Sequence, residues 1–336
     1  MMRLPKTDYH AAQSVEEACS VIAKYGDDAR ILAGGTDLLP ACKFRNLKPA
    51  LLVSLRNVSE LKGIRLHEGQ GLRIGAMTSL YQVRNDPLVK KLFPALAEAA
   101  ATVGATQIQH MGTLGGNLCL NTRCIYYNQS ESWRKSRDVC LKMGGEVCHV
   151  VPNGKRCYAV FSGDTVPAMI ALDARVRLIS NNQERVAPLS SLYTCDGKNP
   201  NSIGQTEILT EIVIPEAVSK QKSTYLKYRA REAIDFPLAG AAVRIDYNDG
   251  KCTNCKVVLN AVDSAPVEVQ EPVELLNGNA PIDQLITQLG EKAEKSAHPV
   301  ANTAGSQPAH RRKMAGILTR RALQHVFETS GLKQGG

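Results

Sequence analysis

Apolar positions at the start of the chain recur first at helical spacing and then at strand spacing. Between residues 14 and 25 they recur every three or four positions, and Ser14 with Glu17 matches a capping box, which predicts a helix. The short apolar runs 30–32 and 50–55 predict strands. We therefore expect a small α/β unit here.

From residue 61 the pattern changes to short strands separated by turns. Strands are expected at 63–66, 72–77, 174–179 and 207–214. The alanine-rich segment 87–101 predicts a helix between them. A proline and a polar run at 215–222 then indicate a domain boundary.

The last third of the chain predicts a hairpin followed by helices. Residues 241–247 and 256–262 flank Asn248-Asp249-Gly250, a sequence typical of a hairpin turn. Helical spacing recurs at 283–295 and 311–329. This region is expected to form a separate α+β domain.

Charge and composition narrow the classes of function. The 336 residues carry a formal net charge of +9, but aromatic residues make up only 5%, which is low for a surface that stacks on bases. Since no nucleic-acid-binding motif is present either, we expect no nucleic acid partner. No signal-peptide pattern and no apolar run of membrane-spanning length is found, which predicts a cytoplasmic protein with no membrane partner and with reduced thiols.

Two glycine pairs are candidates for holding an anionic cofactor. Gly34-Gly35 follows the strand predicted at 30–32, and Gly115-Gly116 lies within 112–117. Paired glycines let backbone N–H groups approach a phosphate because no Cβ is in the way. Each pair alone fits a tight turn better than a cofactor loop, and the chain lacks the GxGxxG pattern of a Rossmann site.

Taken together, segments 33–38 and 112–117 resemble the two FAD-contacting loops of the flavoprotein subunit of the xanthine oxidase family. The likeness continues, in order, at 72–78, 164–174, 227–229, 235–239 and 311–316. The resemblance implies an α+β fold: a vanillyl-alcohol-oxidase (PCMH)-type FAD-binding domain at 1–218, with subdomains of about 1–57 and 58–218. It also implies a C-terminal α+β domain of the CO-dehydrogenase flavoprotein type at 222–330.

The resemblance also implies which residues bind FAD. The diphosphate would be wrapped by Ile31, Leu32, Ala33, Gly34, Gly35, Thr36, Asp37 and Leu38. The diphosphate and the adenosine side would be contacted by Gly112, Thr113, Gly115, Gly116 and Asn117. Ala76 and Thr78 would lie near the flavin, and Asp164 and Lys227 would serve as polar anchors. No catalytic residue is assigned to this chain.

Half of the ten cysteines fall between residues 119 and 157. Cys124, Cys140, Cys148 and Cys157 are separated by 15, 7 and 8 residues, without the paired Cys-x-x-Cys of common zinc sites. Thiolates select zinc, copper(I) or iron–sulfur clusters, and four of them on a glycine-bearing loop can supply one ligand to each iron of a cubane. Disulfides are disfavoured by the expected compartment and by the odd number of cysteines.

This cysteine-rich insertion, at about 119–160, resembles that of one branch of the family, the flavin subunit of 4-hydroxybenzoyl-CoA reductase. The resemblance implies a [4Fe-4S] cluster held by Cys124, Cys140, Cys148 and Cys157. Cys119 is expected to be a small buried side chain instead, and His149 is expected to point away from the cluster.

The function implied is electron transfer through FAD and a [4Fe-4S] cluster within a molybdenum hydroxylase-family complex. The partners implied are a molybdopterin-containing large subunit and a small subunit with two [2Fe-2S] clusters, in a heterotrimer that is doubled, with ferredoxin as electron donor. One alternative is the FAD subunit of a xanthine-dehydrogenase-type hydroxylase that passes electrons to NAD or another acceptor. Another, of a different class, is a non-enzymatic zinc-stabilised binding protein.

Two further patterns carry expectations. Basic residues of the insertion predict a positive rim that steers an acidic electron carrier: Arg134, Lys135, Arg137, Lys142, Lys155 and Arg156. Cys252 and Cys255 are expected to face opposite sides of a strand and to serve in packing.

Overall fold

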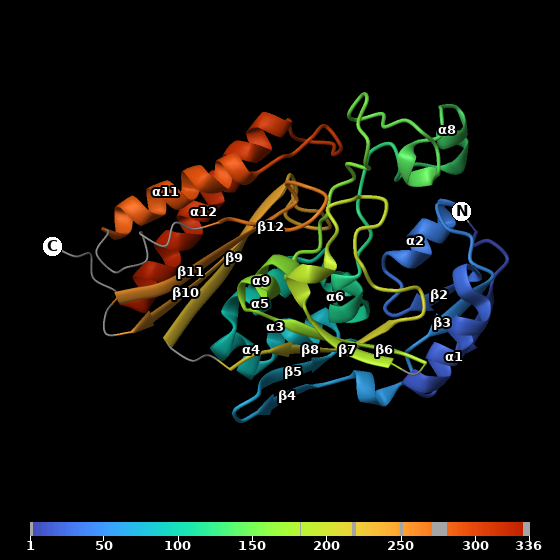
Figure 1. Cartoon of the computed structure of the whole chain (residues 1–336), viewed down its shortest axis with the longest axis horizontal. Helices are drawn as coiled ribbons and strands as arrows, with labels where there is room; N and C mark the ends of the chain where they lie inside the picture. Colours follow the sequence, from blue (N-terminus) through green and yellow to red (C-terminus); the bar gives the residue numbers. More distant parts are fainter. Residues whose placement is uncertain (1–2, 182, 217–219, 249–250, 271–280, 332–336) are drawn as a thin grey trace.

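The N-terminal unit is α/β, as the sequence predicts. The computed structural model describes residues 3–181, 183–216, 220–248, 251–270 and 281–331 (Figure 1). Parallel strands β1 (Asp8–Ala11), β3 (Leu51–Ser54) and β2 (Ala29–Leu32) form the first sheet in that order. The other elements of the unit are α1 (Val15–Tyr25), η1 (Gly26–Asp28) and α2 (Leu38–Lys43). The hydroxyl of Ser14 accepts the backbone N–H of Glu17, so the predicted N-cap of α1 is confirmed.

The middle sheet is antiparallel, in the order β4-β5-β8-β6-β7. Its strands are β4 (Ile64–His67), β5 (Gly71–Gly75), β6 (Arg175–Ser180), β7 (Gln183–Pro188) and β8 (Ile208–Ile214). The four strands predicted in this region are confirmed, and β7 was missed. β7 is an edge strand with a largely exposed, polar sequence, so it has no apolar alternation to detect.

Helices cover this sheet, and one predicted helix proves to be two. Its helical elements are η2 (Ser59–Leu61), α3 (Leu80–Asn85), α4 (Pro87–Leu92), α5 (Pro94–Thr102), α6 (Thr106–Met111), α7 (Leu114–Leu118), α9 (Thr165–Ala171) and η4 (Leu189–Leu192). The helix expected at 87–101 breaks at Phe93, because Pro94 has no N–H with which to continue α4 and instead begins α5.

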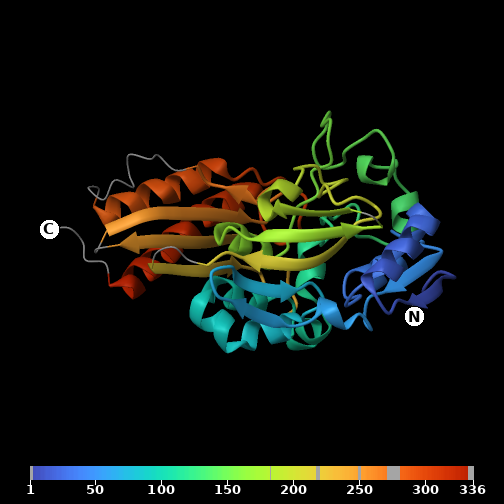
Figure 2. The ribbon, with the colours of Figure 1, turned by 60° about the horizontal axis from the view of Figure 1, so that its bottom comes forward.

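The C-terminal domain is a four-stranded antiparallel sheet with two helices on one face (Figure 2). In the order β12-β11-β10-β9, its strands are β9 (Lys220–Tyr228), β10 (Ala239–Asn248), β11 (Lys251–Asn260) and β12 (Val267–Glu268). Helices α11 (Ile282–Ser296) and α12 (Pro308–Ser330) pack on it. The hairpin is confirmed, although residues 249–250 of its predicted turn lie outside the described residues.

Cys252 and Cys255 were expected to face opposite sides of the sheet, but this expectation is wrong. A β-bulge near Tyr247 shifts the register of β10 and β11 by one residue, and both cysteines pack against the core beneath α11 and α12. The packing role predicted for them is confirmed.

A single hydrophobic core joins the middle sheet to the C-terminal domain. All seven residues of α9 are buried, and they share this core with Tyr225, Ala242 and Val258 from the C-terminal sheet. The two sheets are therefore packed through α9 rather than connected by a loose linker. No helix in the described part of the chain combines the length and apolar character needed to cross a membrane.

The cysteine-rich insertion has little regular structure. Within residues 119–160, the helical elements are α8 (Glu131–Lys135) and the short η3 (Leu141–Met143). Figure 1 shows α8 lying next to the N-terminal unit, to which it is tied by an ion pair between Lys48 and Glu131 at 2.8 Å. The loops of the insertion therefore depend on side-chain contacts for their conformation.

Candidate functional site

The two glycine loops lie against each other. Gly34 follows β2, and a Cβ added to it would overlap the carbonyl oxygen of Met111 and lie 2.9 Å from the Cα of Gly112. Gly35 has a φ of +71°, a left-handed conformation that suits glycine. The approach of the two loops thus requires glycine at position 34, and we call the two loops together, residues 33–38 and 112–117, the glycine cradle.

Backbone hydrogen bonds attach the segment around Ala76 to the second loop. The N–H groups of Leu114 and Gly115 donate to the carbonyls of Thr78 and Ala76, each at 2.9 Å. Thr113 caps α7 by accepting the N–H of Gly116. The three segments predicted to contact FAD, 31–38, 76–78 and 112–117, are therefore brought together.

Two polar side chains in these segments already have partners within the protein. The hydroxyl of Thr78 is buried and exchanges hydrogen bonds with both the N–H and the carbonyl of Gly63. The amide oxygen of Asn117 accepts the backbone N–H and the hydroxyl of Thr165. These side chains help to hold the second loop, whose N–H groups at residues 114–117 all donate within the protein.

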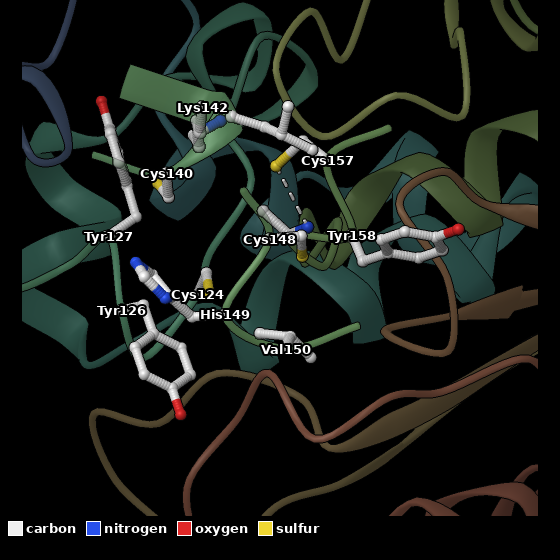
Figure 3. A pocket seen from close by; sticks show the side chains of 12 residues that line it. Cys124, Tyr126, Tyr127, Cys140, Lys142, Cys148, His149, Val150, Cys157 and Tyr158 are labelled. Atoms are coloured by element: carbon white, nitrogen blue, oxygen red, sulfur yellow. Dashed lines mark hydrogen bonds between the residues drawn. The ribbon is translucent and has the colours of Figure 1, made fainter. Parts of the chain in front are cut away.

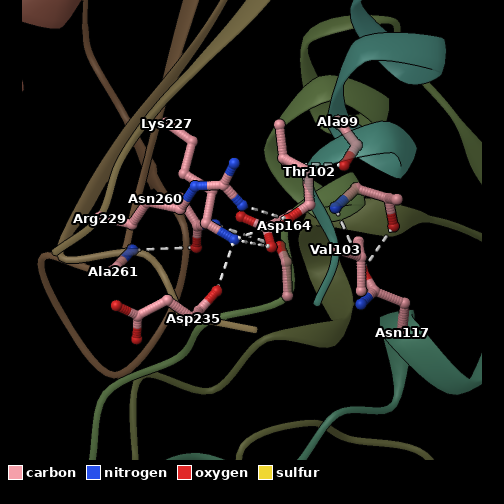
Figure 4. Close-up of polar contacts among 12 residues, drawn as sticks. Ala99, Thr102, Val103, Asn117, Asp164, Lys227, Arg229, Asp235, Asn260 and Ala261 are labelled. Carbon is pink, nitrogen blue, oxygen red and sulfur yellow. Dashed lines mark hydrogen bonds and ion pairs between the residues drawn. The ribbon is translucent and has the colours of Figure 1, made fainter. Parts of the chain in front are cut away.

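Asp164 and Lys227 form a buried ion pair at 2.8 Å between the two domains (Figure 4). Burial raises the pKa of the Asp164 carboxyl, and the adjacent Lys227 ammonium opposes that rise. Tyr225 donates to the other carboxylate oxygen at 2.8 Å, and Lys227 also donates to the carbonyls of Thr102 and Asp235. The pair is thus a satisfied polar link across the interface.

Arg123 connects the insertion to the glycine cradle, a contact that sequence reasoning missed. Its guanidinium pairs with the carboxylate of Asp37 and lies 4.4 Å from the ring centre of Phe236. Its Nε is buried without a hydrogen-bond partner. The only sequence signal was its position directly before Cys124.

The four predicted cysteines line one small cavity (Figure 3). Cys157 is buried, the other three are half-buried, and no disulfide joins them. Backbone N–H groups of Val151 and Ala159 donate to the sulfurs of Cys148 and Cys157, each at 3.4 Å. Such bonds favour the thiolate, the form that binds metal.

The cavity does not have the geometry of a single-ion site. Four sulfurs that bind the same zinc ion, each at about 2.3 Å, would lie within about 4 Å of one another. Among the described residues, no three His, Cys, Asp or Glu side chains are arranged to hold one metal ion. A cubane gives each thiolate a different iron and therefore needs a wider set of ligands.

Electrostatics in the cavity favour thiols over free thiolates. Burial raises the pKa of Cys124 to about 11 and also raises the pKa of Cys157. Burial lowers the pKa of Lys142, which lines the same cavity, to about 8, although the nearby Cys157 and Cys124 act in the opposite direction. The cysteines would lose their protons upon binding metal.

Two expectations about neighbours of the cysteines are wrong. His149 lines the cavity instead of pointing away, with its ring 5.3 Å from that of Tyr126 and its Nε2 2.8 Å from the carbonyl oxygen of Asp138. Cys119 is exposed rather than buried, because it lies at the end of α7.

The predicted positive rim is also wrong for its central residues. Arg134 is buried and donates to the carbonyls of Phe44 and Arg45 at the end of α2, where such a cation is favoured. Lys142 lines the cavity, and Arg156 pairs with Asp263 at 3.1 Å. Lys135, Arg137 and Lys155 are exposed, as a charged rim requires.

Comparisons with known proteins agree with this architecture. Residues 5–217 match the FAD binding domain in molybdopterin dehydrogenase, and residues 224–326 match the CO dehydrogenase flavoprotein C-terminal domain. The carbon monoxide dehydrogenase medium chain of Afipia carboxidovorans is 30% identical over 321 residues, covering 95% of this chain and 96% of the relative. The xanthine dehydrogenase FAD-binding subunit of Escherichia coli O157:H7 is 25% identical, covering 97% of both chains.

A solved structure matches over almost the full length. Carbon monoxide dehydrogenase from Hydrogenophaga pseudoflava, in a form lacking the Mo-pyranopterin moiety of its molybdenum cofactor, superposes with a TM-score of 0.79 at 25% identity, covering 97% of this chain and 99% of that one. The names of these three relatives mention no iron–sulfur cluster. The chain belongs to the FAD-binding medium subunits of the molybdopterin dehydrogenases, within the xanthine oxidase family.

Proposed function

We propose that this chain carries both FAD and a [4Fe-4S] cluster, as the electron-transfer subunit of a complex like 4-hydroxybenzoyl-CoA reductase. The observation that carries the proposal is the cavity lined by Cys124, Cys140, Cys148 and Cys157. Two redox centres in one chain suit a subunit that passes electrons rather than one that binds the substrate.

The glycine cradle fits the diphosphate of FAD. Backbone N–H groups of the first loop would bind the phosphates, and the missing Cβ of Gly34 keeps the two loops in contact. Ile31 to Leu38 and Gly112 to Asn117 would hold the diphosphate and the adenosine side, with Ala76 and the backbone of Thr78 near the flavin. Asp164 and Lys227 would support this site by fixing the domain interface. The unpartnered Nε of Arg123 leaves a donor available beside Asp37.

The cysteine cavity fits a [4Fe-4S] cluster by its donor set. It offers four sulfurs, two backbone N–H donors to sulfur, and no arrangement among the described residues that suits a single ion. When bound, FAD would exchange electrons in pairs or singly, and the cluster would exchange them singly. Together they would connect a partner that transfers two electrons at once with one that transfers single electrons. The chain itself holds these groups, limits water around them and links the two sites through Arg123.

The proposed partners follow from the same likeness to 4-hydroxybenzoyl-CoA reductase. A large subunit with molybdopterin would bind the substrate, and a small subunit with two [2Fe-2S] clusters would connect it to this chain in a doubled heterotrimer. With ferredoxin as donor, the complex would remove the phenolic hydroxyl of 4-hydroxybenzoyl-CoA, consuming two electrons and two protons and releasing benzoyl-CoA and water.

Two other functions give different measurable results. A xanthine-dehydrogenase-type hydroxylase subunit would pass electrons outward to NAD, and the likeness to the Escherichia coli subunit favours it as the second candidate. A zinc-stabilised binding protein would need a single-ion site, which the described residues do not provide.

The test is to purify the complex and measure FAD, iron, zinc and acid-labile sulfide per chain, and then to assay it. We expect one FAD, four irons and four sulfides in this subunit, and benzoyl-CoA formation from 4-hydroxybenzoyl-CoA with reduced ferredoxin. Zinc without sulfide would refute the cluster. NAD reduction in place of dehydroxylation would favour the second candidate.

A further inference from the structure

Lys142 places its ammonium group against the cysteine cavity. It lies two residues after Cys140, in η3, and lines the cavity together with all four cysteines. Figure 3 shows its side chain on the same side of the cavity as Cys140 and Cys157. Nothing in the assignment of the four cysteines as ligands requires a lysine at this position.

The hydrogen bonds of Lys142 match those of an ammonium group. Its Nζ is 2.8 Å from the amide oxygen of Asn121 and 2.7 Å from the hydroxyl oxygen of Thr122, and it also bonds the carbonyl oxygen of Gly197. The hydroxyl of Thr122 gives its own proton to the carbonyl of Gly197, so it acts as an acceptor toward the lysine. Three acceptors match the three N–H donors of an ammonium group.

These partners are all neutral, so the positive charge is not compensated by them. Of the ion pairs within 4 Å among the described residues, none includes Lys142. Asp196 is near enough to attract it, but one of its carboxylate oxygens accepts the N–H groups of Cys157 and Lys198. A partly buried cation without an ion-pair partner is unfavourable unless negative charge is close by.

We propose that Lys142 is the counter-charge of the cluster, a fixed cation that favours its reduced form. This inference rests on the cluster proposed above. A thiolate-ligated cluster is anionic and becomes more negative when it accepts an electron, so a nearby ammonium stabilises the reduced form more than the oxidised form. The three hydrogen bonds hold the ammonium in place, and the charge therefore raises the reduction potential and strengthens cluster binding.

The test compares neutral and charged replacements in the purified complex. We expect Lys142→Met to lower the ratio of reduced to oxidised cluster about tenfold at a given potential, a shift of 59 mV for one electron. Lys142→Arg, which keeps the charge, should shift it far less. Lys135→Met removes the same charge from an exposed position of the insertion and serves as the control. Potentials are measured by redox titration followed by electron paramagnetic resonance, with iron, sulfide and FAD measured in parallel.

Each outcome decides for or against the counter-charge. If Lys142→Met loses iron while Lys142→Arg keeps it, the charge is needed to hold the cluster, which supports the proposal. A wild-type potential in Lys142→Met overturns it. Equal loss of iron in both variants, with FAD retained, would mean that Lys142 only shapes the cavity, and this also overturns the proposal. Absence of iron from the wild-type complex is a separate result, since it rejects the cluster itself.

Discussion

The glycine cradle and the cysteine cavity are built in different ways. The cradle is formed by backbone between regular elements: β2 and α2 flank one loop, and α6 and α7 flank the other. Hydrogen bonds from Leu114 and Gly115 attach the second loop to the segment 76–78. The cavity is formed by side chains on loops, with only α8 and η3 as regular structure nearby.

This difference determines what each site needs from its cofactor. The hydrogen bonds that hold the cradle are made within the protein, so we expect FAD to enter a preformed site. Without a metal centre, burial raises the pKa of Cys124 to about 11 and also raises the pKa of Cys157, which favours the thiol form of both. The cluster would therefore complete the folding of the insertion, as structural metals do in other small loop-rich regions.

The largest expected effect comes from breaking the cradle with Gly34→Ala. The added Cβ would overlap the backbone carbonyl of Met111, which cannot move without disturbing α6 and α7. We expect the FAD content to fall at least about tenfold while iron is retained, because a lost backbone contact of this kind costs more than about 1.4 kcal/mol. FAD is measured by its absorbance after release.

Gly69→Ala is the control for that prediction. It introduces a side chain at a φ of +71° in the turn between β4 and β5, where no atom lies within 4 Å of the new Cβ. It should therefore cost about 1–2 kcal/mol of backbone strain and leave FAD bound. Equal FAD loss in both variants would mean that general instability, not loop contact, explains the effect.

The next effect comes from removing one ligand with Cys140→Ser. We expect iron and sulfide to be lost or the cluster to be converted, and protease cleavage within 119–160 to become faster, while FAD stays bound. Cys119→Ser, at an exposed cysteine outside the cavity, is the matched control and should keep its iron. Iron retained in Cys140→Ser, or lost in Cys119→Ser, would show that the four ligands were wrongly chosen.

Much of the fold could be predicted because its signals are periodic. Buried alternation in strands such as β8 and helical spacing in α1 are direct consequences of a one-sided core. The errors arose where a local feature overrides the period. Pro94 divides one helix into two, an exposed edge position hides β7, and a bulge brings Cys252 to the same face as Cys255.

Only the parts of the candidate site that form recognisable sequence motifs could be predicted. The glycine loops and the four cysteines are visible in the sequence, and the structure brings each set together. The roles of charged residues could not be predicted, because they depend on which distant backbone groups they meet. Arg134 binds carbonyls at the end of α2, and Arg123 meets Asp37, which lies 86 residues away in the chain.

The smallest expected effect is the most informative about the link between the two sites. Arg123 precedes Cys124 directly in the chain, and its guanidinium pairs with Asp37 in the cradle. We expect Arg123→Met to weaken FAD binding about tenfold in the cluster-loaded chain, since a partly buried charged hydrogen bond contributes about 1.5 kcal/mol. If the cluster fixes the loop that follows Arg123, the same substitution should change FAD affinity much less in chain depleted of iron.

Arg185→Met is the control for this comparison, because Arg185 forms a surface ion pair with Glu207 away from both loops and should leave FAD affinity unchanged. FAD dissociation constants are measured by fluorescence titration of all variants, with and without the cluster. Thermodynamic linkage requires that, if the cluster strengthens FAD binding through Arg123, FAD must strengthen cluster binding by the same free energy. Equal weakening of FAD binding with and without iron would show that Arg123 supports the cradle alone and that the preformed site and the cluster-dependent site act independently.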